Sequence, residues 1–94
     1  MPRYLIRRNF GAVDDEAMTQ VGINSNRVIA ESTPDIVWEV SHVVASPEGD
    51  ILTYCVYQAP NEERVREHAE LLGGHFVEAI YEIGGDVAPA DFPA

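Results

Sequence analysis

The chain has 94 residues, the length of one small domain, and its apolar share of 46% is that of a globular protein. Six basic residues face sixteen acidic ones, and the formal net charge of −10 disfavours nucleic acids and anionic membranes as partners, because both are bound through Lys and Arg. The charge suits a cationic partner such as a metal ion, although it also serves solubility alone. Cys55 is the only cysteine and cannot form an internal disulfide, and no stretch approaches a membrane span, so a cytoplasmic location is expected.

The first third of the chain predicts a strand followed by a helix. Residues 3–10 alternate imperfectly between apolar and polar side chains, which is typical of a strand. Acidic residues from Asp14 to Glu16 then favour a helix start, and apolar residues at helical spacing extend the helix over about residues 14–31. Asn24 and Ser25 fall on its apolar stripe, where polar side chains require hydrogen-bond partners.

The rest of the chain predicts a hairpin, a second helix and a last strand. The segments are a strand over 36–45, a turn-rich loop over 46–50, a strand over 51–58, a helix from Asn61 to Gly73, a strand over 77–83 and a proline-containing tail over 86–94. Asn61 is suited to cap the second helix, and Gly73-Gly74 is suited to end it.

This order of elements is the β-α-β-β-α-β pattern of the ferredoxin-like sandwich, an α+β fold. We expect a single domain over residues 1–94, with a four-stranded antiparallel sheet and two helices on one of its faces. The other face would carry apolar side chains such as Leu5, Val43 and Ile80, which favours pairing into a homodimer. The fold name implies no iron–sulfur cluster, because such clusters need about four cysteines.

The three histidines are the candidate metal ligands. Strand alternation places His42 on the same face as Trp38, and if that face meets the helices, His42 and His68 point into one layer. His75, after the double glycine, would be a third ligand. Imidazoles suit nickel, zinc, copper or iron. The alternative is that each histidine is an ordinary packed or surface residue.

A pocket between sheet and helices is the second candidate site. Asn24, Trp38, Tyr54 and Cys55 would line it, although Cys55 is equally explained as a small buried side chain. No spacing of Ser, His, Asp or Cys marks a catalytic nucleophile, so no catalytic residue is assigned. The pocket would serve a cofactor-free enzyme or a small-molecule-binding dimer, and a plain interaction domain is a third possibility.

Several runs together resemble a family of small bacterial nickel-binding proteins with a ferredoxin-like fold, formerly a domain of unknown function. They are Trp38-Glu39-Val40-Ser41-His42-Val43, Thr53-Tyr54-Cys55-Val56-Tyr57-Gln58-Ala59-Pro60, Val65-Arg66-Glu67-His68-Ala69 and the tail from Gly85 to Pro93. With the opening strand, the resemblance spans most of the chain.

The resemblance implies a dimer that binds nickel for storage or sequestration, with His68 and Cys55 at family positions. The family often has a histidine two residues after the tryptophan, where this chain has Val40. His42 lies two residues further along with the same strand parity, so it either replaces the missing ligand or the metal site is weakened or lost.

Overall fold

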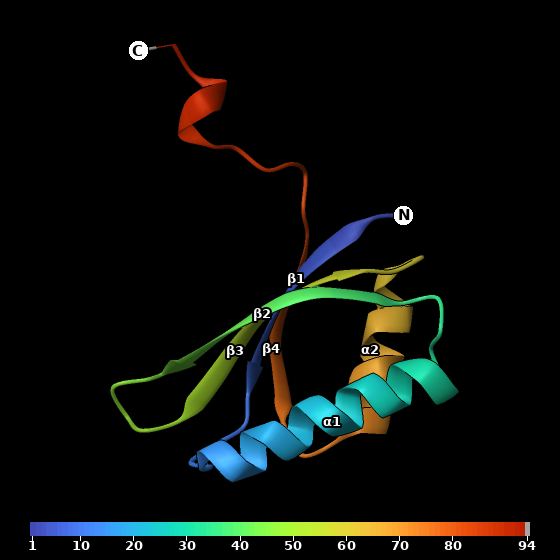
Figure 1. Ribbon diagram of the computed structural model, residues 1–94, viewed down its shortest axis with the longest axis vertical. Helices are drawn as coiled ribbons and strands as arrows, with labels where there is room; N and C mark the ends of the chain where they lie inside the picture. Colours follow the sequence, from blue (N-terminus) through green and yellow to red (C-terminus); the bar gives the residue numbers. More distant parts are fainter. Residues whose placement is uncertain (94) are drawn as a thin grey trace.

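The computed structural model describes residues 1–93 and contains the predicted elements in the predicted order (Figure 1). They are β1 (Arg3–Asn9), α1 (Asp15–Glu31), β2 (Val37–Ala45), β3 (Ile51–Gln58), α2 (Glu62–Leu72) and β4 (Phe76–Glu82). A short 3-10 turn (Pro89–Asp91), which the sequence did not predict, follows in the tail. Asp14 caps α1 by accepting a hydrogen bond from the backbone N–H of Ala17, and Asn61 caps α2 through the N–H of Arg64. Gly73 ends α2 with a positive φ of 68°, which glycine adopts without steric cost.

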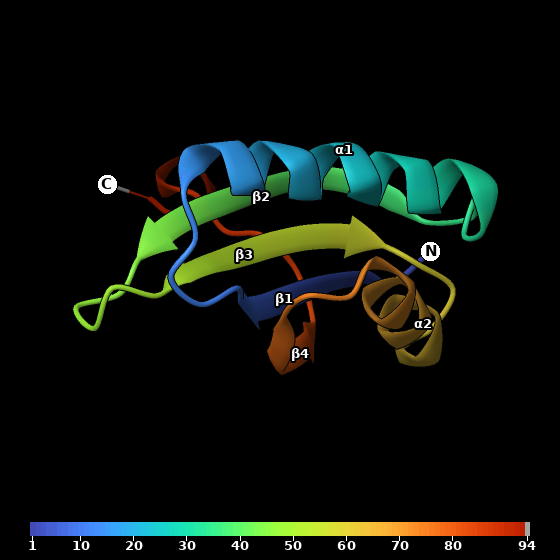
Figure 2. The ribbon, with the colours of Figure 1, turned by 90° about the horizontal axis from the view of Figure 1, so that it is seen from below.

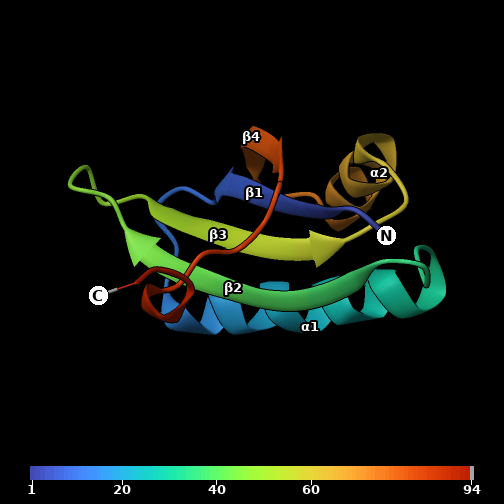
Figure 3. The same cartoon turned by 90° about the horizontal axis from the view of Figure 1, so that it is seen from above.

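The four strands form one antiparallel sheet in the order β2-β3-β1-β4. Both helices lie on the same face of this sheet, with α1 along β2 and α2 on the side of β1 and β4 (Figure 2). The opposite face is covered by neither helix (Figure 3). The fold is therefore the α+β ferredoxin-like sandwich that the sequence predicts.

The core lies between the sheet and the helices. Alternate residues of β1 and β3, including Tyr4, Ile6, Cys55 and Tyr57, are buried against Val65 of α2. This period of two along the central strands is the pattern of a sheet with one packed face. The predicted inner face of β1 is confirmed, and it also includes Arg8, which is only 2% exposed.

Two β-bulges change which side chains face the helices. Residues paired across antiparallel strands share a face, and an extra residue in one strand reverses the alternation beyond it. In β2 the pairing passes from Trp38–Tyr57 to Val40–Val56, so Glu39 is the extra residue. All residues after it in β2 lie on the face opposite to the one that simple alternation predicts.

The expected members of the uncovered face are corrected by these registers. Leu5 lies on that face, since its neighbours Tyr4 and Ile6 point into the core. Val43 pairs with buried Thr53, and Ile80 pairs with Ile6 after the bulge in β4, so both lie on the helix side.

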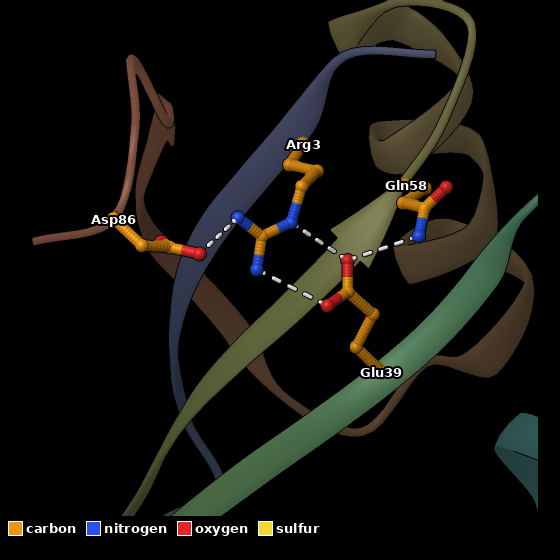
Figure 4. Close-up of polar contacts among 4 residues, drawn as sticks. All are labelled: Arg3, Glu39, Gln58 and Asp86. Carbon is orange, nitrogen blue, oxygen red and sulfur yellow. Dashed lines mark hydrogen bonds and ion pairs between the residues drawn. The ribbon is translucent and has the colours of Figure 1, made fainter.

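An ion-pair network spans the uncovered face at the bulge (Figure 4). The Arg3 guanidinium donates from Nε and Nη2 to the two carboxylate oxygens of Glu39, at 2.8 and 3.1 Å, and from Nη1 to Asp86 at 2.8 Å. Gln58 also donates to Glu39, at 3.2 Å. The hydrogen bonds from Arg3 lower the pKa of the Glu39 carboxyl. The extra residue of β2 is thus anchored across β3 to β1.

The tail after β4 leaves the domain. It extends away from the sheet on the side of the uncovered face (Figures 1 and 3), and its apolar side chains Val87 and Phe92 are 77% and 61% exposed. Ala94 of the predicted tail lies outside the described residues. Within residues 1–93, no helix combines the length and apolar character that crossing a bilayer requires.

Candidate functional site

His68 lies at the centre of the helix layer. Its side chain is fully buried on α2, and its Nε2 forms a hydrogen bond with the Ser25 hydroxyl of α1 at 3.1 Å. The ring meets the Tyr57 ring edge to face at 5.5 Å between centroids. The prediction that Ser25 needs a polar partner within the core is therefore confirmed, and that partner is His68.

Burial keeps the His68 imidazole neutral. The pKa of His68 falls from 6.5 to about 4, mainly because burial penalises the charged ring, and also because Arg8 and His75 are nearby positive or ionisable groups. Its Nδ1 is buried and has no hydrogen-bond partner among the described residues. At neutral pH the ring is an uncharged polar group buried between the sheet and the helices.

Arg8 is the charged group of this layer, and sequence reasoning did not single it out. Its side chain is 2% exposed, and Nη1 donates to the Tyr57 hydroxyl at 3.0 Å. The alternation of β1 does indicate the burial of Arg8, because it puts position 8 on the same face as Tyr4, Ile6 and Phe10. The sheet–helix layer therefore contains a buried cation.

A cavity of about 140 Å³ lies beside Arg8, between α1 and the sheet. The residues that border it include Arg8, Ser25, Ser41 and Thr53, and its exposed wall is almost entirely apolar. Of the four residues predicted to form a pocket, Trp38 and Cys55 line this cavity. The Cys55 thiol is buried and donates to the Thr53 hydroxyl at 3.4 Å.

The other two predicted pocket residues lie elsewhere. Asn24 accepts a hydrogen bond from the Gln20 side chain on α1, at 3.0 Å. Tyr54 alternates with the buried residues Thr53 and Cys55, so its side chain lies on the uncovered face of the sheet. Neither Asn24 nor Tyr54 therefore lines the cavity.

His42 lies on the uncovered face and not in the helix layer. It pairs with Tyr54, while its neighbour Ser41 pairs with buried Cys55 and accepts a hydrogen bond from the Trp38 indole. The expectation that His42 and Trp38 share a face is wrong, because the bulge at Glu39 reverses the alternation between them. His42 and His68 are consequently on opposite sides of the sheet.

His75 follows α2 and packs on the helix side. Its ring stacks on Phe10 at 4.9 Å between centroids, and its Nδ1 contacts the Gly73 carbonyl at 2.9 Å. Burial lowers its pKa, and Arg8 acts in the same direction. Over residues 1–93 the structure contains no cluster of three or more His, Cys, Asp or Glu side chains arranged to hold a metal ion.

Comparison with known proteins relates the chain to one family. A family model for "Nickel responsive protein SCO4226-like" matches residues 4–83. The crystal structure of SCO4226 from Streptomyces coelicolor A3(2) superposes with a TM-score of 0.67 at 20% identity, covering 90% of this chain and 99% of that one. The solution structure of the C-terminal domain of the MgtC protein from Mycobacterium tuberculosis gives a TM-score of 0.58 at 20% identity, covering 96% and 94%.

These two structural likenesses, at such low identity, establish the fold alone. No curated protein matches the chain by sequence. The family model spans most of the chain, including both helices and nearly all of the sheet. The chain therefore belongs to the SCO4226-like family of nickel responsive proteins.

Proposed function

We propose that this protein is a cytoplasmic homodimer that binds nickel, for sequestration or storage, at a site on the uncovered sheet face that includes His42. The observation that carries this proposal is the position of His42, an exposed imidazole on the face that neither helix covers, in a chain whose family is described as nickel responsive. Imidazole nitrogen is a ligand type that suits nickel.

The helix layer is the less favourable place for a divalent cation. Arg8 is buried there, and its positive charge adds to the effect of burial, which is the main reason why the pKa of both His68 and His75 is lowered. The same charge would repel a metal ion more strongly than a surface arginine would, because screening is weak inside a protein. The electrostatics therefore favour a nickel site on the other face of the sheet.

The resemblance to the nickel-binding family supports the same face. It implies a histidine at position 40, where this chain has Val40. Val40 and His42 both follow the bulge, pair with Val56 and Tyr54, and lie on the uncovered face. Positions two apart on a strand lie on one side about 7 Å apart, so His42 can supply an imidazole near the place where the family ligand would be.

One chain supplies one imidazole on this face, so we propose that a second copy completes the site. The face also carries apolar side chains that a partner would cover: Val40, Val44 and Tyr81 are 44%, 40% and 60% exposed. Face-to-face pairing of two sheets is a common way to bury such a surface, and a twofold arrangement brings the same residues of both chains together.

Isothermal titration of metal-free protein with nickel tests this proposal. We expect saturable binding in the wild type, a loss of that binding in His42→Ala, and binding close to wild type in His68→Gln, the matched control on the other face. Saturable binding that persists in His42→Ala and disappears in His68→Gln would overturn the assignment of the site.

The dimer is tested separately by light scattering after size-exclusion chromatography. The wild type should have the mass of two chains. Val44→Glu places a charge on the uncovered face, where burying it against an apolar partner is costly, and should yield a monomer with weakened nickel binding. A monomeric wild type that binds nickel fully would refute the two-chain site.

A further inference from the structure

Arg8 is buried, whereas Arg27, which also pairs with no carboxylate of the described residues, is exposed to solvent. Arg3, Arg7, Arg64 and Arg66 are partly or largely exposed and each pairs with a carboxylate. Arg8 is 2% exposed, and no carboxylate of residues 1–93 lies within ion-pairing distance of it. This is notable in a chain with sixteen acidic residues.

The hydrogen-bonding capacity of Arg8 is also largely unused. Nη1 donates to the Tyr57 hydroxyl, and the guanidinium carbon lies 5.0 Å from the centre of the Tyr57 ring. Nε and Nη2 are buried and have no partner within the described residues. A guanidinium keeps its charge at all relevant pH values, and leaving such a charge buried without a counter-charge is strongly unfavourable. A bound anion would offset that cost.

The cavity beside Arg8 has the size and lining for the apolar part of such an anion. Its volume is about 140 Å³, and an apolar protein cavity of about 150 Å³ accepts benzene. Phe10, Met18, Val21 and Trp38 supply much of its apolar wall. Val43, which is 58% exposed, also borders the cavity, so the cavity reaches the surface near β2.

We propose that this cavity binds a small monocarboxylate with an apolar body of about the size of benzoate, whose carboxylate pairs with Arg8. The planar fork of a guanidinium matches a carboxylate through two parallel hydrogen bonds. A single negative charge balances the one cation that lines the cavity. A phosphate dianion would leave a second charge in a largely apolar space, which is unfavourable. The site is independent of the nickel proposal.

Fluorescence of Trp38 reports binding directly, because it is the only tryptophan and lines the cavity. Metal-free protein in the presence of a chelator is titrated with benzoate and with benzamide, which has the same shape and no charge. We expect a saturable change with benzoate and at least tenfold weaker binding of benzamide. Arg8→Met should weaken benzoate binding by at least about tenfold, whereas Arg27→Met, at an exposed arginine of α1, should not.

If Arg8 has a structural role alone, the fluorescence titrations give different results. If Arg8 serves only to pack on Tyr57, the wild type will show no saturable response, or will bind benzoate and benzamide equally, and the proposal is overturned. Should Arg8→Met fail to fold, the comparison of the two ligands on the wild type still decides, because it requires no variant.

Discussion

Acidification is expected to destabilise this protein through His68 before most carboxylates titrate. His68 contacts Ser25 of α1 and Tyr57 of β3, and its charged form is disfavoured by Arg8 of β1 and His75 beyond α2. None of these is an acid that would stabilise a charged imidazole. As pH falls below 6.5 the unfolded chain takes up a proton at this position, while the folded protein does not until about pH 4. The contribution of neutral His68 to stability is therefore fully present above pH 6.5 and is lost as the pH falls from 6.5 toward 4.

The size of the effect follows from the two pKa values. With 6.5 in the unfolded chain and about 4 in the folded protein, proton linkage removes about 2 kcal/mol of unfolding free energy between pH 7.5 and pH 5, and about 3 kcal/mol by the time both states are protonated. His75, whose pKa burial also lowers, acts with the same sign. The wild type should therefore lose at least as much unfolding free energy between pH 7.5 and pH 5 as His68 alone accounts for.

Urea unfolding at pH 7.5 and pH 5, followed by Trp38 fluorescence, measures this loss. His68→Gln is the matched variant, since it keeps a polar side chain opposite Ser25 but has no group that titrates. We expect the loss between the two pH values to be smaller in the variant by about 2 kcal/mol. An equal loss in both proteins, or a wild-type His68 ring that NMR shows to be protonated at pH 5.5, would refute the reasoning.

Three further substitutions have defined outcomes. Gly22→Ala should raise the unfolding free energy by about 0.5–1 kcal/mol in urea titrations, since Gly22 lies within α1 and the added methyl would meet Trp38 at 3.9 Å, an ordinary contact; a decrease would mean that α1 cannot accept it. Asn61→Ala removes the cap of α2 and should lower the unfolding free energy by about 1 kcal/mol, and an unchanged value would contradict that role. Val40→His adds an imidazole on the face of His42 and should tighten nickel binding by about tenfold or more in calorimetry, since even a ligand's outer-shell partner alters metal affinity by about 10–100-fold; unchanged affinity would count against a site on that face.

The fold could be predicted from the sequence because each element has a strong local signal. The acids from Asp14 to Glu16, the cap at Asn61 and the glycines at 73 and 74 mark the helix ends, and the alternation in β1 and β3 marks the packed face. These signals depend on neighbouring residues alone, so they do not require knowledge of the partner strands.

The faces of β2 could not be predicted in the same way. The extra residue is Glu39, which is neither glycine nor proline, and the bulge is visible only in its pairing with β3 and in its ion pair with Arg3. Every residue after it changes face, and that one shift separates His42 from His68. The burial of Arg8 was not predicted for a different reason, because arginine side chains are mostly exposed to solvent.

Paramagnetic broadening of amide signals by nickel tests the location of the metal most directly. In the two-dimensional NMR spectrum of the protein, substoichiometric nickel should first broaden signals of β2 around His42 and of β3 around Tyr54, and should leave α2 around His68 sharp. Broadening centred on α2, with β2 unaffected, would contradict a nickel site on the uncovered face.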